Sequence, residues 1–260
     1  MAFPKFTEGP STERPVIRHD HGFLDDGNNN LDTGKMRAAT WEDFKLLAFW
    51  TAKLNGAELL RPDLRDGTAA YRHFLDKSGT DHIVPYESFL SDDPSGKTVL
   101  KSVIEDTVAS TIAIHDAKLG VPPPTTARTD KFEIVSAAIP VGGRDSRYPY
   151  PKTENWQKAI GAHFIWVNAE VEVVIDPVAK RRAFEVKMTV HMEDMYNFNP
   201  GGAKDIATGT PDEENGRFEV TGLGVEFLSK AQFNRTIRFT EPLAPVADVR
   251  VPPVDQKVGR

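Results

Sequence analysis

One stretch of this chain concentrates residue types that do chemistry on charged substrates. From Asp194 to Phe218 the sequence reads DMYNFNPGGAKDIATGTPDEENGRF, so acids, amides, glycines and one arginine follow directly after a run typical of a β-strand. A packed core does not require such residues in succession, whereas a loop that binds a charged substrate does. This stretch is therefore the first candidate for a functional site.

Asp194 is the most informative acid because of its place at the end of that strand-like run. Apolar and polar side chains alternate from Phe184 to Met192, and counting on by twos puts Asp194 on the apolar face. A carboxylate there loses part of its hydration and needs a cation, a metal ion or several donors as partners. The alternative is that Asp194 only caps the turn that begins at Tyr196.

The residues after Asp194 offer partners for it. NPGG is a turn sequence, acids follow at Asp205 and Asp212, and Arg217 carries a planar guanidinium suited to phosphate or carboxylate. Hard cations prefer carboxylate oxygens, so Asp194 and Asp205 are predicted to hold Mg²⁺, although acid-rich loops are also common on ordinary surfaces. The predicted catalytic residues are Asp194, Tyr196, Asp205, Asp212 and Arg217, and the predicted substrate-binding residues are Asn197, Asn199 and Asn215.

A second segment, RHDHGFLDDGNNN, has a metal-like composition. His19 and His21 flank Asp20, with more acids close behind. Residues two apart converge on one ion only where the segment is ordered, and this segment lacks apolar periodicity. The sequence therefore argues against a site here.

Other signatures of familiar enzymes are absent. DDPSGKTVL resembles the end of a phosphate-binding loop, but Ser91 stands where the pattern requires its first glycine. Neither GxSxG nor HExxH occurs, which removes the most familiar serine-hydrolase and zinc-peptidase motifs.

Composition limits the class of protein. With 39% apolar and 27% charged residues, the 260-residue chain is typical of a globular protein. The net charge of −6 argues against general nucleic-acid binding, and zero cysteines exclude disulfides and thiol nucleophiles. No run of about 18 apolar residues predicts a transmembrane span, and the N-terminus lacks the pattern of a secretory signal.

The first half of the chain predicts helices. Residues 1–39 have no apolar periodicity and are expected to form an extended leader, while residues 40–120 form a helical region. Within it, Trp41 to Asn55 is predicted to be a core helix, because its apolar residues fall near helical spacing: Trp41, Phe44, Leu47, Ala48 and Leu54. Further helices are predicted from Thr68 to Lys77 and from Lys97 to Leu119.

The second half predicts antiparallel strands. Alternation runs from His163 to Ile175 and from Arg182 to Glu193, with further strands at 132–139 and 233–240. The fold class is therefore α+β, with N-terminal helices followed over residues 131–241 by an antiparallel sheet that could curl into an open barrel. The proline-rich residues 242–260 are expected to be an extended tail.

At residues 155 to 240 the chain resembles the catalytic region of the colicin M family, bacteriocins that hydrolyse lipid II. Two strands lead to DMYNFNPG, followed by NGRFEVTGLGVEFL and a final strand. Position by position, Asp194 matches the family's first acid, Tyr196 its tyrosine and Arg217 its arginine. The resemblance implies a sheet of the colicin M catalytic type and a phosphodiesterase.

Two departures from the family pattern matter. Asn197 stands where the family has a second acid, and Asn215 or Gly216 stands where it has a histidine. The same catalysis would then require Asp205 or Asp212, together with a histidine such as His191. The open alternative is a non-enzymatic binding or delivery module that keeps the shape.

A longer match, over NWQKAIGAHFIWVNAEVEV and EDMYNFNPGGAKDIATGTPDEENGRF, resembles uncharacterised proteins encoded among polymorphic-toxin and type VI secretion genes. It implies an antibacterial effector that is made in the bacterial cytoplasm, secreted without a cleaved signal peptide and active in the target-cell periplasm. The implied partners are lipid II or another envelope substrate, an immunity protein and the secretion apparatus.

Overall fold

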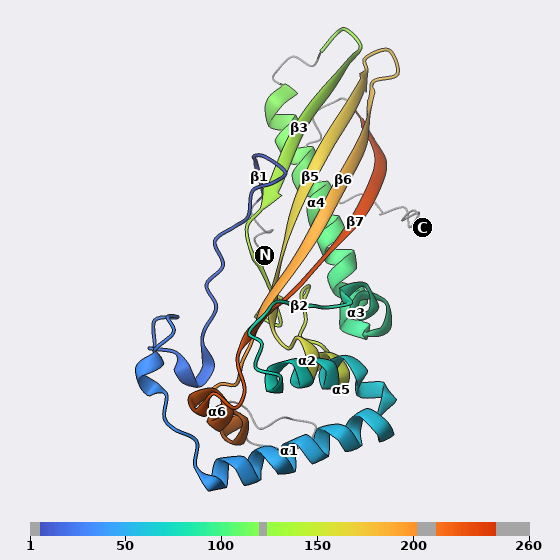
Figure 1. Ribbon diagram of the computed structural model, residues 1–260. Coiled ribbons are helices and arrows are strands. Elements are labelled where there is room, and N and C mark those ends of the chain that lie inside the picture. Colours follow the sequence, from blue (N-terminus) through green and yellow to red (C-terminus); the bar gives the residue numbers. More distant parts are fainter. Residues whose placement is uncertain (1–5, 120–123, 202–211, 243–260) are drawn as a thin grey trace.

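The computed structural model describes residues 6–119, 124–201 and 212–242, and it is built around one twisted, open sheet (Figure 1). The spatial order of the strands is β1-β3-β5-β6-β7-β2, and β4 pairs with β5 beside this path. All the pairings are antiparallel except that of β2 with β7. The strands are β1 (Phe6–Glu8), β2 (His82–Ile83), β3 (Arg128–Ser136), β4 (Ile139–Val141), β5 (His163–Asp176), β6 (Arg181–Tyr196) and β7 (Phe227–Pro242).

The alternation of the sequence sets which face of the sheet is buried. In β5, for example, Ile165, Val167 and Ala169 are buried and belong to the main core. In β6, every second residue from Phe184 to Met192 is also buried in this core. The residues between them face the other side of the sheet. The predicted α+β class is confirmed, and the sheet is open, with β1 and β2 at its two edges.

The helices lie along one face and at one end of the sheet (Figure 1). The long α4 covers the apolar face, and its buried Val103, Ile104 and Val108 join the sheet in the main core. A smaller core joins Phe74, Phe218 and Phe227 near the end of the sheet. The helices are α1 (Trp41–Leu60), α2 (Arg65–Leu75), α3 (Tyr86–Asp92), α4 (Pro94–Leu119), α5 (Glu154–Ala159) and α6 (Asp212–Thr221), with 3-10 turns η1 (Gly22–Leu24), η2 (Thr33–Lys35) and η3 (Pro62–Leu64).

The prediction that Trp41 to Asn55 forms a core helix is wrong in one respect. The helix exists and continues to Leu60, but Asp43 and Leu54 are its buried residues, while Trp41 and Phe44 are exposed. The helix is anchored instead through a charged residue: Asp43 accepts bonds from Arg37 and Arg217. Helical spacing of apolar residues identified the helix, but only part of the face predicted to be buried is buried. Leu54 is buried and Leu47 packs against the smaller core, whereas Trp41 and Phe44 are exposed.

From Phe6 on, the N-terminal segment is mostly extended and is held against the rest of the protein. β1 adds to the sheet beside β3, and η1 packs on α6. Two glycines permit this contact. A Cβ on Gly216 would lie 2.1 Å from the ring of Phe23, and one on Gly22, which has φ +54, would lie 2.2 Å from the carbonyl oxygen of Phe198.

Candidate functional site

Asp194 lies near the end of β6, on the face that carries the core residue Met192. Its partner in register on β7 is Ser229, and the partner of Ser229 on β2 is His82. Residues paired in this way share one face of the sheet, so the three form a row across three strands. Ser229 is fully buried, and its hydroxyl has no hydrogen-bond partner within the described residues.

The surroundings of Asp194 oppose its negative charge. Burial, followed by the charges of Asp20 and Glu193, raises the pKa of Asp194 well above its usual range, although a hydrogen bond from the backbone N–H of Met195 acts in the other direction. A carboxyl group shifted in this way holds its proton closer to neutral pH. Such a group is suited to proton transfer in a reaction.

Asp20 reaches this place because the N-terminal segment passes the end of β6. The side-chain amide of Asn197 donates to the carboxylate of Asp20 at 2.8 Å and to its backbone carbonyl at 2.9 Å. Next to it, His21 Nδ1 lies 2.7 Å from Glu226 Oε1. Asp20 and His21, which belong to the segment RHDHGFLDDGNNN, therefore lie among the acids around Asp194.

His19 contacts the opposite face of the sheet, at the same end of β6. Its Nε2 lies 2.7 Å from Oε1 of Glu193, which Arg14 also binds. Burial would raise the pKa of Glu193, but the hydrogen bond of His19 and the charge of Arg14 outweigh it and lower that pKa. Glu193 is thus an ionised anchor for the N-terminal segment, in contrast to its neighbour Asp194.

Glu219 of α6 ties the two chain segments of the site together. Its carboxyl oxygens accept hydrogen bonds from the backbone N–H of Phe198 at 2.7 Å and of Phe23 at 3.1 Å. Burial raises the pKa of Glu219 to about 8, although these two bonds lower it, and the charges of Glu226 and Asp20 add to the rise. The site therefore contains a second carboxyl group with a raised pKa.

The predicted aromatic and amide residues have structural partners. Tyr196 stacks on Phe227 with ring centroids 4.9 Å apart. Asn215 is buried and accepts a hydrogen bond of 2.6 Å from the hydroxyl of Tyr71, whereas Asn199 is exposed. Of the three amides predicted to bind substrate, Asn197 is the one that contacts a residue of this site, Asp20.

Of the remaining predicted residues, Arg217 is engaged with an acid other than Asp194. Arg217 binds Asp43 through Nε at 2.9 Å and Nη2 at 2.6 Å, so its guanidinium fixes the start of α1. Asp212 is the first residue of α6. Asp205 lies outside the described residues, and His191 stacks on Trp166 on the far face of the sheet.

The carboxylates around Asp194 decide whether the site could bind Mg²⁺. Within residues 6–119, 124–201 and 212–242, no group of three or more side chains could hold a metal ion. Mg²⁺ often takes only one or two carboxylates and completes its shell with water and substrate phosphate. Asp194 and Asp20, whose negative charges repel one another, are the pair of carboxylates in the site from which that smaller requirement would have to be met.

Sequence reasoning missed four residues of the site: Asp20, His21, Glu219 and Glu226. The histidine-rich motif was a usable signal for the first two. Nothing in the spacing of Glu219 or Glu226 indicated a site, because their role depends on contacts with residues about 200 positions earlier.

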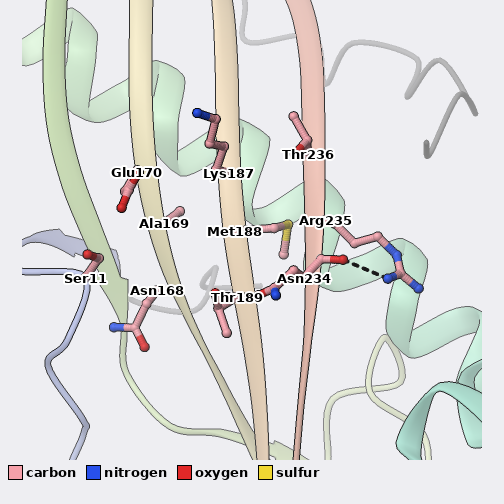
Figure 2. A pocket seen from close by; sticks show the side chains of 10 residues that line it. All are labelled: Ser11, Asn168, Ala169, Glu170, Lys187, Met188, Thr189, Asn234, Arg235 and Thr236. Atoms are coloured by element: carbon pink, nitrogen blue, oxygen red, sulfur yellow. Dashed lines mark hydrogen bonds between the residues drawn. The ribbon is translucent and has the colours of Figure 1, made fainter. Parts of the chain in front are cut away.

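A separate hollow lies on the polar face of the sheet (Figure 2). Its volume is about 440 Å³, and at five residues from Asp194 along β6, Thr189 is roughly 16 Å away. Its lining is mixed and gives no cluster of titratable groups around one point. The lining residues are Ser11, Asn168, Ala169, Glu170, Lys187, Met188, Thr189, Asn234, Arg235 and Thr236.

Comparison with known proteins gives little beyond this geometry. No family model matches the chain, and no curated protein matches it. Among solved structures, the chain is similar to PaeM, a colicin M-like bacteriocin produced by Pseudomonas aeruginosa, at 13% identity and a TM-score of 0.34. The similarity covers 68% of this chain and 51% of PaeM, so the chain matches about half the length of that protein.

Proposed function

We propose that this chain is an antibacterial effector of colicin M type that hydrolyses lipid II at the bond between undecaprenol and the pyrophosphoryl sugar. The observation that carries the proposal is the place of Asp194, a half-buried carboxyl group on the core face at the end of β6, where the charge of Asp20 also acts on it. The motif DMYNFNPG, which resembles that of the colicin M family, ends the same strand.

The proposed step is attack of water on phosphorus. The water oxygen bonds to phosphorus as the bond from phosphorus to the lipid oxygen breaks, and the proton that the water gives up ends on the lipid oxygen, so the lipid leaves as an alcohol. Asp194 in its ionised form accepts the proton of the water, since a raised pKa makes it a better base. In the alternative role of Asp194 as a metal ligand, Asp194 and Asp20 are the residues that would hold Mg²⁺, which when bound would offset the negative charge of the phosphates.

A second candidate function is a binding module without catalysis. Two observations favour it: Asn197, which replaces an acid of the family pattern, is engaged with Asp20, and Arg217 is engaged with Asp43. In that case the chain keeps the shape of the site and uses it to bind an envelope component. The two candidates differ in whether lipid II is turned over.

The test compares the parent chain with Asp194→Asn, which keeps the shape of the side chain and removes its charge. Purified protein is incubated with lipid II and Mg²⁺, and the released lipid alcohol is measured. We expect Asp194→Asn to lower turnover by at least about 100-fold, the scale of a lost general base. The matched control is Asp63→Asn, an exposed acid of η3 that should retain full turnover.

Expression in bacteria gives the cellular counterpart. With an added signal peptide, the parent should lyse cells from the periplasm, and without one it should not. Full turnover by Asp194→Asn would refute the assignment of this residue. A folded parent protein without turnover or lysis would favour the binding module.

A further inference from the structure

Charged residues close the main core at the end of the sheet that lies away from the candidate site. Arg182 is on the core face of β6 and is buried, and its neighbour in register on β7 is Glu241. It precedes Asp194 by about 12 residues on the same strand, so the two are roughly 40 Å apart. In Figure 1 the last turns of α4 run toward this end of the sheet, away from α2 and α6.

His115 of α4 is fully buried among these charges and uses both of its ring nitrogens. Its Nε2 lies 3.1 Å from Oδ2 of Asp130 on β3, and its Nδ1 lies 2.9 Å from Nη1 of Arg182. A guanidinium nitrogen can only donate, so Nδ1 accepts from Arg182, and Nε2 carries the hydrogen that is donated to Asp130. The geometry therefore requires a neutral imidazole in one defined tautomer.

A proton on Nδ1 would break this arrangement. It would place an N–H opposite the N–H of Arg182, so two donors of like charge would meet in a place shielded from water. Arg182 is already short of partners, because its buried Nε has no hydrogen-bond partner among the described residues. Phe132 and Phe184 hold the imidazole ring in position, with ring centroids 6.0 and 5.5 Å from it.

Other charged groups lie around the ring and modify this balance. They are Asp116 and Lys118 of α4, Arg128 of β3, Glu241 of β7 and Glu8 of β1, while β5 contributes the apolar Val173 and Ile175. Asp116 binds Nη1 of Arg182 from the solvent side, and Arg128 pairs with Asp130. Burial lowers the pKa of His115 below its usual 6.5, the hydrogen bond with Asp130 acts against this, and the charge of Arg182 lowers the pKa further.

We propose that His115 is an acid-sensitive latch, which holds the C-terminal end of α4 on the sheet while its ring is neutral and releases that end in acid. In the neutral state this one side chain joins α4 to β3 through Asp130 and to β6 through Arg182. When the end of α4 opens, the ring meets water and takes up a proton as an ordinary histidine does, so acid stabilises the open form. The latch does not depend on the proposed reaction.

The direction of the pH dependence follows from the lowered pKa of His115. Above about pH 7 the ring is neutral in both the closed and the open form, so the latch has its full stability. As pH falls below 6.5 the open form binds more protons than the closed form, and the closed form loses stability until pH passes its own, lower pKa. Glu241 acts in the opposite direction, because burial raises its pKa. Variants that all keep Glu241 share this contribution.

The first experiment records the state of the ring by NMR of the full chain labelled with ¹⁵N-histidine. At pH 7.5 we expect His115 to be neutral with its hydrogen on Nε2. Hydrogen exchange then measures the release of the helix end. After correction for the intrinsic exchange rate, protection of residues 108–116 should fall about tenfold between pH 7.5 and pH 5, and by no more than about 30-fold, the gain of an open form whose histidine titrates at 6.5. Amides in the middle of β5 and β6 should stay protected.

The decisive variant is His115→Gln, whose amide keeps a donor and an acceptor but cannot take up a charge. Its protection over residues 108–116 should change by less than about twofold over the same pH range. Arg182→Gln is a second variant that leaves the histidine in place. It should also lose most of the acid response, because Asp130 and Asp116 then favour a charged ring in the closed form.

The matched control is His73→Gln near the other end of the sheet, where the ring lies 2.7 Å from the backbone carbonyl oxygen of Thr80. Its response over residues 108–116 should equal that of the parent. Three results would overturn the proposal: a hydrogen on Nδ1 of His115 at pH 7.5, protection of residues 108–116 in the parent that does not change with pH, or an equal acid response in His115→Gln and the parent. None of these measurements uses lipid II, so their outcome is separate from that of the turnover test.

Discussion

Glu219 combines two properties that seldom occur in one carboxyl group. It is buried with a pKa raised to about 8, yet it accepts hydrogen bonds from the backbone of Phe198 and Phe23. Because the folded state keeps this proton to a higher pH than the unfolded chain does, the folded state loses stability as pH rises from about 4.5 to about 8. Below that window the carboxyl is protonated in both states and has no such effect.

Glu219→Gln should therefore change how stability depends on pH. At pH 5 the variant should be less stable than the parent by about 1 kcal/mol, because one backbone N–H loses its acceptor. Between pH 5 and pH 8.5 the free energy of unfolding of the parent should fall, relative to that of the variant, by at most about 4 kcal/mol, because the buried carboxyl of the parent ionises. Urea unfolding at both pH values measures the difference.

The control for this prediction is Glu213→Gln, an exposed carboxylate in the first turn of the same helix. Its difference from the parent should be the same at both pH values. A constant gap between the parent and Glu219→Gln would contradict the buried, late-titrating carboxyl inferred here.

At the residue scale, sequence reasoning succeeded where the cause was local. The position of Asp194 on the apolar face follows from a period of two along β6, and no knowledge of the other strands was required. The sequence argued against a site at Asp20 and His21, because no local pattern places them. Their positions depend on contacts with Asn197 and Glu226, which lie far along the chain. A single sequence contains no local signal for such a contact.

Among the elements, α1 depends on one buried acid for its position. The carboxylate of Asp43 accepts hydrogen bonds from Arg37 at 2.7 and 2.9 Å and from Arg217 at 2.6 and 2.9 Å. It also accepts from the backbone N–H and the hydroxyl of Thr40, and these bonds are part of a capping box. The bonds from Arg37, with those from Thr40 and Arg217, hold the pKa of Asp43 well below its usual range in spite of burial. One carboxylate thus joins α1, α6 and the chain that precedes the helix.

Asp43→Ala should destabilise the protein by about 3 kcal/mol, because two guanidinium groups and the helix cap lose their shared partner. The measurement is the free energy of unfolding in urea. The control is Glu42→Ala, one position before Asp43, which breaks only an exposed ion pair with Lys45. Its free energy of unfolding should stay within about 0.5 kcal/mol of that of the parent. Similar losses in both variants would mean that the network of Asp43 does not anchor α1.

The elements were predictable in proportion to their length. The long strands β5 and β6 and the helix α4 repeat their pattern often enough to be recognised. The short β2, β4, α3 and α5 were missed, because two to seven residues do not establish a period. The apolar pattern predicted the helix α1, but it did not predict that Trp41 and Phe44 are exposed. The spacing of apolar residues does not show which of them pack against the rest of the protein.

For the molecule as a whole, the N-terminal segment is a strap along the sheet. β1 pairs with β3, the backbone carbonyl of Glu13 accepts from Asn168 at 2.8 Å, and Arg14 and His19 bind Glu193. Only after these contacts does the chain reach Asp20. The position of the site acid Asp20 is therefore set by attachment points on several strands.

Glu193→Ala should loosen this strap and leave the sheet intact. Hydrogen exchange of amides in residues 10–24 should become roughly tenfold faster, the effect of about 1.4 kcal/mol of lost local stability, while β5 and β6 remain protected. Glu185→Ala, on the same strand but paired with Arg238 at the sheet surface, is the control that should leave residues 10–24 unchanged. Faster exchange throughout the sheet would show that Glu193 supports the whole fold instead.

The long separation between His21 and Glu226 has a consequence for the cell that makes the protein. Asp20 and His21 leave the ribosome early, whereas Asp194 follows much later and Glu226 and Ser229 come close behind α6. Domains fold as units once their contacts are available, so a growing chain has the first half of the site without its partners until most of the sheet has been synthesised. Incomplete translation products that stop before β7 thus contain no assembled site, and any activity of the site begins only with chains translated through that last strand.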